Sequence, residues 1–134
     1  MLQSETKIRV RYGETDKMGY VYYGNYAEYY EVARTEFIRK YGITYKELED
    51  RGIMLPVNSL KIKYIKPSFY DDVLKIQTTI NELPGVRIHF DYKVFNQNDE
   101  LVNVGETTLV FVDMKTGKPV KAPEFFLDNI KQFF

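Results

Sequence analysis

The chain has 134 residues, of which 44% are hydrophobic and 16% aromatic, which is enough to bury a core as one domain over residues 1–134. Nineteen basic residues balance nineteen acidic ones, which argues against a nucleic-acid binder because such proteins carry a basic excess. The absence of cysteine excludes disulfides, thiolate zinc ligands and a cysteine nucleophile, and the reducing cytoplasm is the simplest location for such a chain.

The apolar runs of the sequence predict a soluble protein. Residues 1–10 are too polar and too quickly charged for a signal peptide. No run approaches the roughly 18 apolar residues of a membrane span. We therefore expect no membrane association.

The first half of the chain predicts a strand followed by two helices. Apolar residues alternate with arginines over residues 8–12, and a turn-like stretch and an aromatic segment lead to Asn25. Apolar residues then recur at spacings of three and four, which predicts a four-turn helix ending near Gly42, with its apolar face formed by Tyr26, Tyr29, Tyr30, Ala33, Phe37 and Tyr41. Thr44 and Glu47 have capping-box spacing, so a short helix is expected over residues 44–51.

The second half predicts strands joined mainly by hairpins. The expected strands cover residues 60–66, 73–82, 86–95 and 101–113, and a closing helix is expected from Pro123 through Phe133. Five strands with one dominant helix against one face are typical of an α+β protein.

Several chemical motifs are absent. Gly19 and Gly24 have phosphate-loop spacing without the following lysine, and no G-x-S-x-G nucleophile elbow occurs. One histidine and no cysteine argue against a metal site. His89 lies on one face of a predicted strand together with Arg87 and Asp91. It is either a surface residue or a general base, and no residue near it in the sequence is expected to orient it.

Asp16 is the main catalytic candidate, although it has two interpretations. It is either a turn or capping aspartate, or a carboxylate that faces the start of the long helix. The unpaired N–H groups there stabilise an oxyanion while the carboxylate attacks a carbonyl or activates water. Tyr22 or Tyr23 could line a pocket beside it.

The segment from Tyr12 to Tyr26, YGETDKMGYVYYGNY, resembles the first motif of the 4-hydroxybenzoyl-CoA thioesterase family of hotdog-fold acyl-CoA thioesterases. That motif has an acidic residue, any residue, Asp, two variable residues, Gly, and an aromatic-rich run ending in Asn-Tyr. The resemblance continues through the helix segment YEVARTE, the strand end YIKP, the segment YDDVL and the late turn GKP. It covers nearly the whole chain in the right order.

This resemblance implies a hotdog fold, a five-stranded antiparallel sheet wrapped around the long helix. It also implies a homodimer with the active site at its interface, or a homotetramer of two such dimers. Asp16 matches the catalytic aspartate, and Tyr23 matches the position whose backbone N–H polarises the thioester carbonyl. Ser59 matches a stretch bordering the pantetheine channel, and Arg87 is what remains of a basic cluster that binds CoA phosphates.

The leading functional prediction is hydrolysis of an acyl-CoA thioester to a free acid and CoA, with no metal or redox cofactor. The carrier could also be an acyl-carrier protein. Two alternatives remain open at this point: a hotdog hydratase or dehydratase that uses His89, and a non-catalytic module that binds acyl-CoA or acyl-carrier protein.

Overall fold

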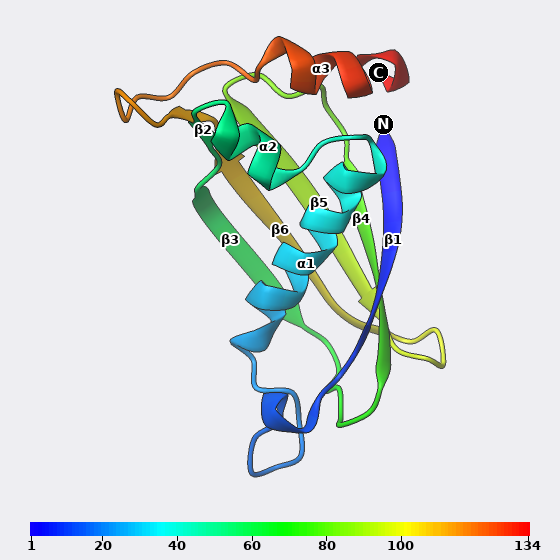
Figure 1. Ribbon diagram of the computed structural model, residues 1–134. Helices are drawn as coiled ribbons and strands as arrows, with labels where there is room; N and C mark the ends of the chain where they lie inside the picture. The colour runs from blue at the N-terminus through cyan, green and yellow to red at the C-terminus, as the bar shows by residue number, and fades with distance from the viewer.

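The computed structural model describes residues 1–134 and is built on one five-stranded antiparallel sheet (Figure 1). The spatial order of its strands is β1-β4-β5-β6-β3. These strands are β1 (Leu2–Arg9), β3 (Val57–Tyr64), β4 (Val73–Ile80), β5 (Arg87–Phe95) and β6 (Leu101–Val110). A separate antiparallel pair joins β2 (Ile53–Met54) to β7 (Val112–Asp113).

One long helix, α1 (Asn25–Lys40), lies across one face of the sheet (Figure 1). The apolar face predicted from the sequence is buried against the sheet, apart from Tyr41, which follows the helix and is partly exposed. Two short helices complete the fold, α2 (Tyr45–Asp50) and α3 (Glu124–Ile130), together with the 3-10 turns η1 (Tyr12–Glu14) and η2 (Lys131–Phe133). The structure therefore confirms the α+β prediction. None of its helices combines the length and the apolar character that crossing a membrane requires.

Tyrosine rings connect α1 to the middle of the sheet. The Tyr30 ring stacks on the Tyr92 ring with centroids 4.2 Å apart, and the Tyr30 hydroxyl donates a hydrogen bond to Asn103 Oδ1 at 2.6 Å. The ring also lies over Gly105, where an added Cβ would come within 2.4 Å of the Tyr30 hydroxyl oxygen. The close approach of helix and sheet therefore requires glycine at this position.

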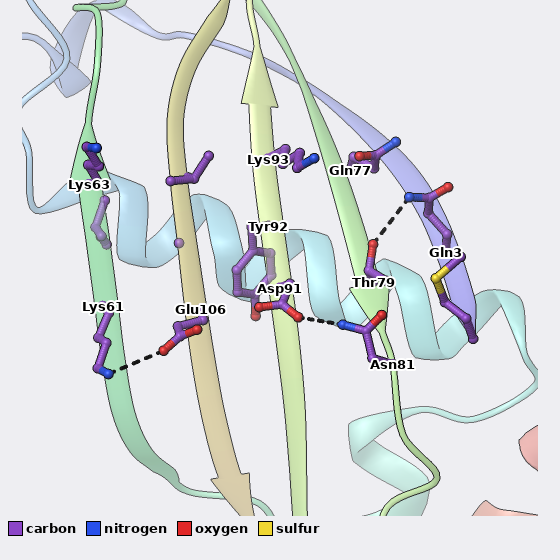
Figure 2. Close-up of a pocket in the computed structure, with 14 residues that line it drawn as sticks. Gln3, Lys61, Lys63, Gln77, Thr79, Asn81, Asp91, Tyr92, Lys93 and Glu106 are labelled. Atoms are coloured by element: carbon purple, nitrogen blue, oxygen red, sulfur yellow. Dashed lines mark hydrogen bonds and ion pairs between the residues drawn. The ribbon is translucent and has the colours of Figure 1, made fainter. Parts of the chain in front are cut away.

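The alternation predicted for β5 sorts its residues between the two faces of the sheet. Ile88, Phe90 and Tyr92 are buried under α1, whereas His89 and Lys93 are exposed on the opposite face. Figure 2 shows this outer face, where lysine, acidic and amide side chains stand on neighbouring strands. The sheet is thus half buried, as a period of two requires.

Several element boundaries differ from prediction. The strand expected over residues 60–66 is β3 at Val57–Tyr64, the strand expected over residues 73–82 ends at Ile80, and the helix expected through Phe133 ends as α3 at Ile130 and continues as the 3-10 turn η2. The first strand was expected over residues 8–12, but β1 begins at Leu2 and ends at Arg9, because its full length pairs with β4 from Leu2 opposite Ile80 to Arg9 opposite Val73. The last strand ends at Val110, and residues 112–113 pair separately with β2. Pro123 is the residue before α3 rather than its first residue.

Candidate active site

Asp16 lies in a tight turn that precedes α1. Its Oδ1 accepts hydrogen bonds from the backbone N–H of Met18 at 2.8 Å and of Tyr20 at 3.3 Å, whereas Oδ2 accepts none within the protein. The turn is closed by the Gly19 N–H, which donates to the Asp16 carbonyl, and Gly19 has a φ of 81° that favours glycine. Asp16 is therefore a turn aspartate with one oxygen available for another contact.

Glu14 ties this turn to the helix. Its carboxylate accepts hydrogen bonds from the Arg11 N–H at 2.8 Å and from the buried Tyr29 hydroxyl at 2.9 Å, and it pairs with the Arg11 guanidinium at 3.0 Å. Its carbonyl oxygen accepts from the Tyr22 N–H and from Asn25 Nδ2, both at 2.8 Å. The segment bearing Asp16 is thereby fixed to the first two turns of α1.

The environment of Glu14 favours its charged form. Burial, the largest single effect, raises the pKa of the Glu14 carboxyl, but the hydrogen bonds from Arg11 and Tyr29 and the Arg11 charge together outweigh it and lower that pKa. Burial and the bond to Glu14 raise the pKa of the Tyr29 hydroxyl, which stays protonated as the donor. The sequence analysis did not predict this role of Glu14, although the motif has an acidic residue at this position, two residues before Asp16.

The start of α1 presents free hydrogen-bond donors. The backbone N–H groups of Tyr23 and Gly24 donate to no acceptor of the protein, and no side chain caps the helix at Gly24. The Tyr23 carbonyl is held by the Tyr64 hydroxyl at 3.2 Å. Free donors at a helix N-terminus carry a partial positive charge, so they can bind the oxygen of a carbonyl and stabilise an oxyanion.

An aromatic hollow of about 250 Å³ adjoins these donors. Tyr20, Tyr23 and Tyr26 line it, together with Tyr64 at the end of β3 and Ile65 and Lys66, which follow that strand. Of the two pocket candidates, Tyr23 lines the hollow and Tyr22 does not. Tyr26 is otherwise part of the core, as predicted, and its hydroxyl donates to Ser68 Oγ.

Ser59 and Arg87 lie at the opposite end of the sheet from Asp16 and Tyr23. Ser59 is exposed near the start of β3, opposite Thr108 of β6, and Arg87 is the exposed first residue of β5. Arg87 lines an open hollow of about 740 Å³ formed with the β4–β5 hairpin. In Figure 1 the turn that bears Asp16 is at the bottom, while β3 and β5 begin near the top. A single chain thus places only two of the four predicted site residues, Asp16 and Tyr23, at this end of the fold.

His89 is exposed on the outer face, as predicted, but the expectation that no residue near it in the sequence orients it is wrong, because Asp91 lies two residues away and contacts its ring. Its Nδ1 lies 2.9 Å from Thr108 Oγ1, and its Nε2 lies 3.3 Å from Asp91 Oδ1 and 3.6 Å from Glu106 Oε2. Thr108 and Glu106 belong to β6, which the sheet places beside β5. This face is opposite to the one covered by α1.

Comparison with known proteins agrees with this architecture. A sequence model of the thioesterase-like superfamily matches residues 10–130. The acyl-CoA thioester hydrolase YbgC of Escherichia coli is 33% identical over 125 residues, which cover 93% of this chain and 93% of that protein.

Two solved structures of CoA thioesterases have the same fold as this chain. The DHNA-CoA thioesterase of Staphylococcus aureus superposes with a TM-score of 0.92 and 38% identity, covering 99% of this chain and 89% of that one. A 4-hydroxybenzoyl-CoA thioesterase in complex with 4-hydroxybenzoyl-CoA shares the fold with a TM-score of 0.84 at 23% identity, covering 95% of this chain and 97% of that one.

The sheet, the helix across it and the donors at the helix start define a hotdog-fold protein of the thioesterase class. The chain belongs to the thioesterase-like superfamily. The resemblance to hotdog-fold thioesterases is therefore confirmed.

Proposed function

We propose that this protein hydrolyses acyl-CoA thioesters to a free carboxylic acid and CoA in the cytoplasm. The observation that carries the proposal is the pair of free N–H groups at Tyr23 and Gly24, which adjoin an aromatic hollow and follow the turn that holds Asp16. The relationship to named CoA thioesterases supports the same reaction.

In this scheme the thioester carbonyl oxygen accepts a hydrogen bond from the Tyr23 N–H. Asp16 Oδ2 either attacks the carbonyl carbon or takes a proton from an attacking water. The tetrahedral intermediate then collapses with cleavage of the C–S bond, and the CoA thiolate takes up a proton. When water is the nucleophile this gives the free acid directly, whereas attack by Asp16 leaves an acyl anhydride on Asp16, which water hydrolyses to the free acid and the original carboxylate. The chemical step uses no metal or redox cofactor.

We assign the acyl group to the hollow beside the helix start. Its lining of Tyr23, Tyr26 and Tyr64 suits an aromatic acyl group, because ring edges and faces pack favourably. Lys66 also lines the hollow, and although its ammonium pairs with Glu100, its remaining N–H groups can donate to a ring hydroxyl. The 38% identical S. aureus protein is named for DHNA-CoA, which supports an aromatic acyl group. The same name supports CoA, rather than an acyl-carrier protein, as the carrier that we propose.

A homodimer is proposed as the active unit. Strand β3 is an edge of the sheet and exposes Val57, Leu60 and Tyr64. The unpaired backbone groups of an exposed apolar edge strand readily pair with another strand, so β3 is the edge at which a second copy would bind. Antiparallel pairing of two β3 edges places the start of one β3 beside the end of the other. The Ser59 and Arg87 end of one copy then approaches the Asp16 and Tyr23 end of its partner, which completes the site.

Release of free thiol from short-chain, long-chain and aromatic acyl-CoAs tests the reaction. Replacing Asp16 with Asn keeps the side-chain volume and removes the nucleophile or base, so we expect turnover to fall by about 10² to 10⁴. Asp50→Asn, on the exposed surface of α2, is the matched control and should turn over normally. Wild-type turnover in Asp16→Asn would refute the role of Asp16.

The same assay separates the alternatives. Tight acyl-CoA binding without thiol release indicates a binding module, and activity on an enoyl-thioester that depends on His89 but not Asp16 indicates a hydratase. Sedimentation at micromolar concentration should give a dimer or a tetramer, and a monomer that retains full activity contradicts the shared site.

A further inference from the structure

The outer face of the sheet carries a cluster of three metal-binding side chains that thioester hydrolysis does not use. Asp91 of β5 lies directly opposite Glu106 of β6, and His89 of β5 lies two residues from Asp91 on the same face. The donor atoms of these three residues all lie within 4.8 Å of one another. They face away from α1, and Figure 2 shows Asp91 and Glu106 on this side of the sheet.

From this geometry we propose that His89, Asp91 and Glu106 bind one divalent transition-metal ion of the zinc class. A tetrahedral ion with donors at about 2.0–2.1 Å separates neighbouring donor atoms by about 3.3–3.4 Å. His89 Nε2 lies 3.3 Å from Asp91 Oδ1 and 3.6 Å from Glu106 Oε2. Small side-chain rotations would therefore complete the set.

Each donor residue is held by its second polar atom. His89 Nδ1 lies 2.9 Å from Thr108 Oγ1, Asp91 Oδ2 accepts from Asn81 Nδ2 at 2.8 Å, and Glu106 Oε1 pairs with Lys61 at 3.5 Å. Figure 2 shows the last two of these contacts as dashed lines. Such outer partners orient the ligands of protein metal sites, and an ion bound between the inner atoms Nε2, Oδ1 and Oε2 would replace the hydrogen bond of 3.3 Å that joins Nε2 to Oδ1.

Charge gives an independent reason for a cation at this place. Asp91 and Glu106 are like charges directly opposite each other in an antiparallel pair, an arrangement that destabilises a sheet. Lys61 pairs with the outer oxygen of Glu106, and Lys63 and Lys93 stand on the same face of the sheet, so these lysines offset part of the repulsion without entering the space between the three donor atoms. A dication between the two carboxylates removes the repulsion.

The donor set selects the ion. One imidazole nitrogen with two carboxylate oxygens suits Zn²⁺, Mn²⁺ or Co²⁺, whereas Mg²⁺ and Ca²⁺ prefer oxygen donors alone. The three side chains are 38 to 45% exposed, so water can enter and fill the remaining coordination position. The site lies on the face of the sheet opposite to α1, and its existence does not depend on the proposed hydrolysis.

Because His89 is the sole histidine of the chain, its ring protons report on the site directly in a proton NMR spectrum of tag-free protein. Zn²⁺ added to chelator-treated protein at pH 7.5 should shift these signals saturably at one ion per chain, and Co²⁺ should broaden them. Calorimetry under the same conditions gives the affinity. Zn²⁺ should also raise the melting temperature of the wild type and leave that of His89→Ala unchanged.

Variants locate the ion. Asp91→Asn and Glu106→Gln should each weaken Zn²⁺ binding at least tenfold, and Asn81→Ala, which removes an outer partner, by about tenfold. Asp50→Asn is the control and should bind normally. The proposal is overturned if His89 signals respond to pH but not to Zn²⁺ or Co²⁺, or if His89→Ala binds Zn²⁺ as tightly as the wild type.

Discussion

Replacing Glu14 with alanine should destabilise the protein by about 3 kcal/mol, because the carboxylate holds the Asp16 turn against α1. The buried Tyr29 hydroxyl loses its acceptor, which costs about 1–3 kcal/mol. The backbone N–H of residue 11 loses a charge-assisted bond of 2.8 Å, worth about 1.5–3 kcal/mol. The ion pair with the Arg11 guanidinium adds little, since that side chain is 79% exposed.

Urea unfolding at pH 7 and one fixed protein concentration measures this loss. Tyr29→Phe removes the hydroxyl alone, and in the Glu14→Ala background its cost should shrink because the acceptor is already gone. The double-mutant cycle should therefore give a coupling of about 1 kcal/mol or more. A cost below 1 kcal/mol for Glu14→Ala, or strictly additive single changes, would refute the reasoning.

Three further predictions concern pH, packing and capping. Because the folded-state pKa of Glu14 lies below its ordinary value of 4.5, its contribution to stability is complete at neutral pH and is lost as the pH falls below about 4.5; Glu14→Gln should flatten this acid limb in thermal melts. Gly105→Ala should cost about 1–3 kcal/mol in urea unfolding, because its Cβ meets the immobile Tyr30 ring, and a neutral effect would show that α1 can shift. Thr44→Ala should lower the free energy of unfolding by about 1 kcal/mol in the same urea titration, because the Thr44 hydroxyl accepts a hydrogen bond from the Glu47 N–H at the start of α2. Thr44→Ser keeps the hydroxyl and should retain most of the wild-type stability.

Some elements could be predicted from the sequence because their signals are local. The spacing of Tyr26, Tyr30 and Phe37 placed α1 to within about one residue, and the capping-box spacing of Thr44 and Glu47 placed α2. The alternation over residues 86–95 separated buried from exposed positions within β5, although Val86, which shared the apolar face by pattern, precedes the strand and is exposed. The motif around Asp16 pointed to the hotdog fold and to the turn that precedes the helix.

Other features depend on residues that are distant in the chain. The start of β1 could not be predicted, because residues 2–7 are mostly polar and become a strand only by pairing with β4. The role of Glu14 depends on Tyr29, which lies fifteen residues later on the helix.

The sequence by itself determined the α+β class, the long helix and the position of Asp16 before it, because periodicity and turn chemistry act over a few residues. Only the tertiary structure decided that Asp16 and Ser59 lie at opposite ends of one sheet and that Glu106 stands beside His89. Such neighbours are set by strand order and register, which join residues far apart in the chain and therefore leave no local pattern in the sequence.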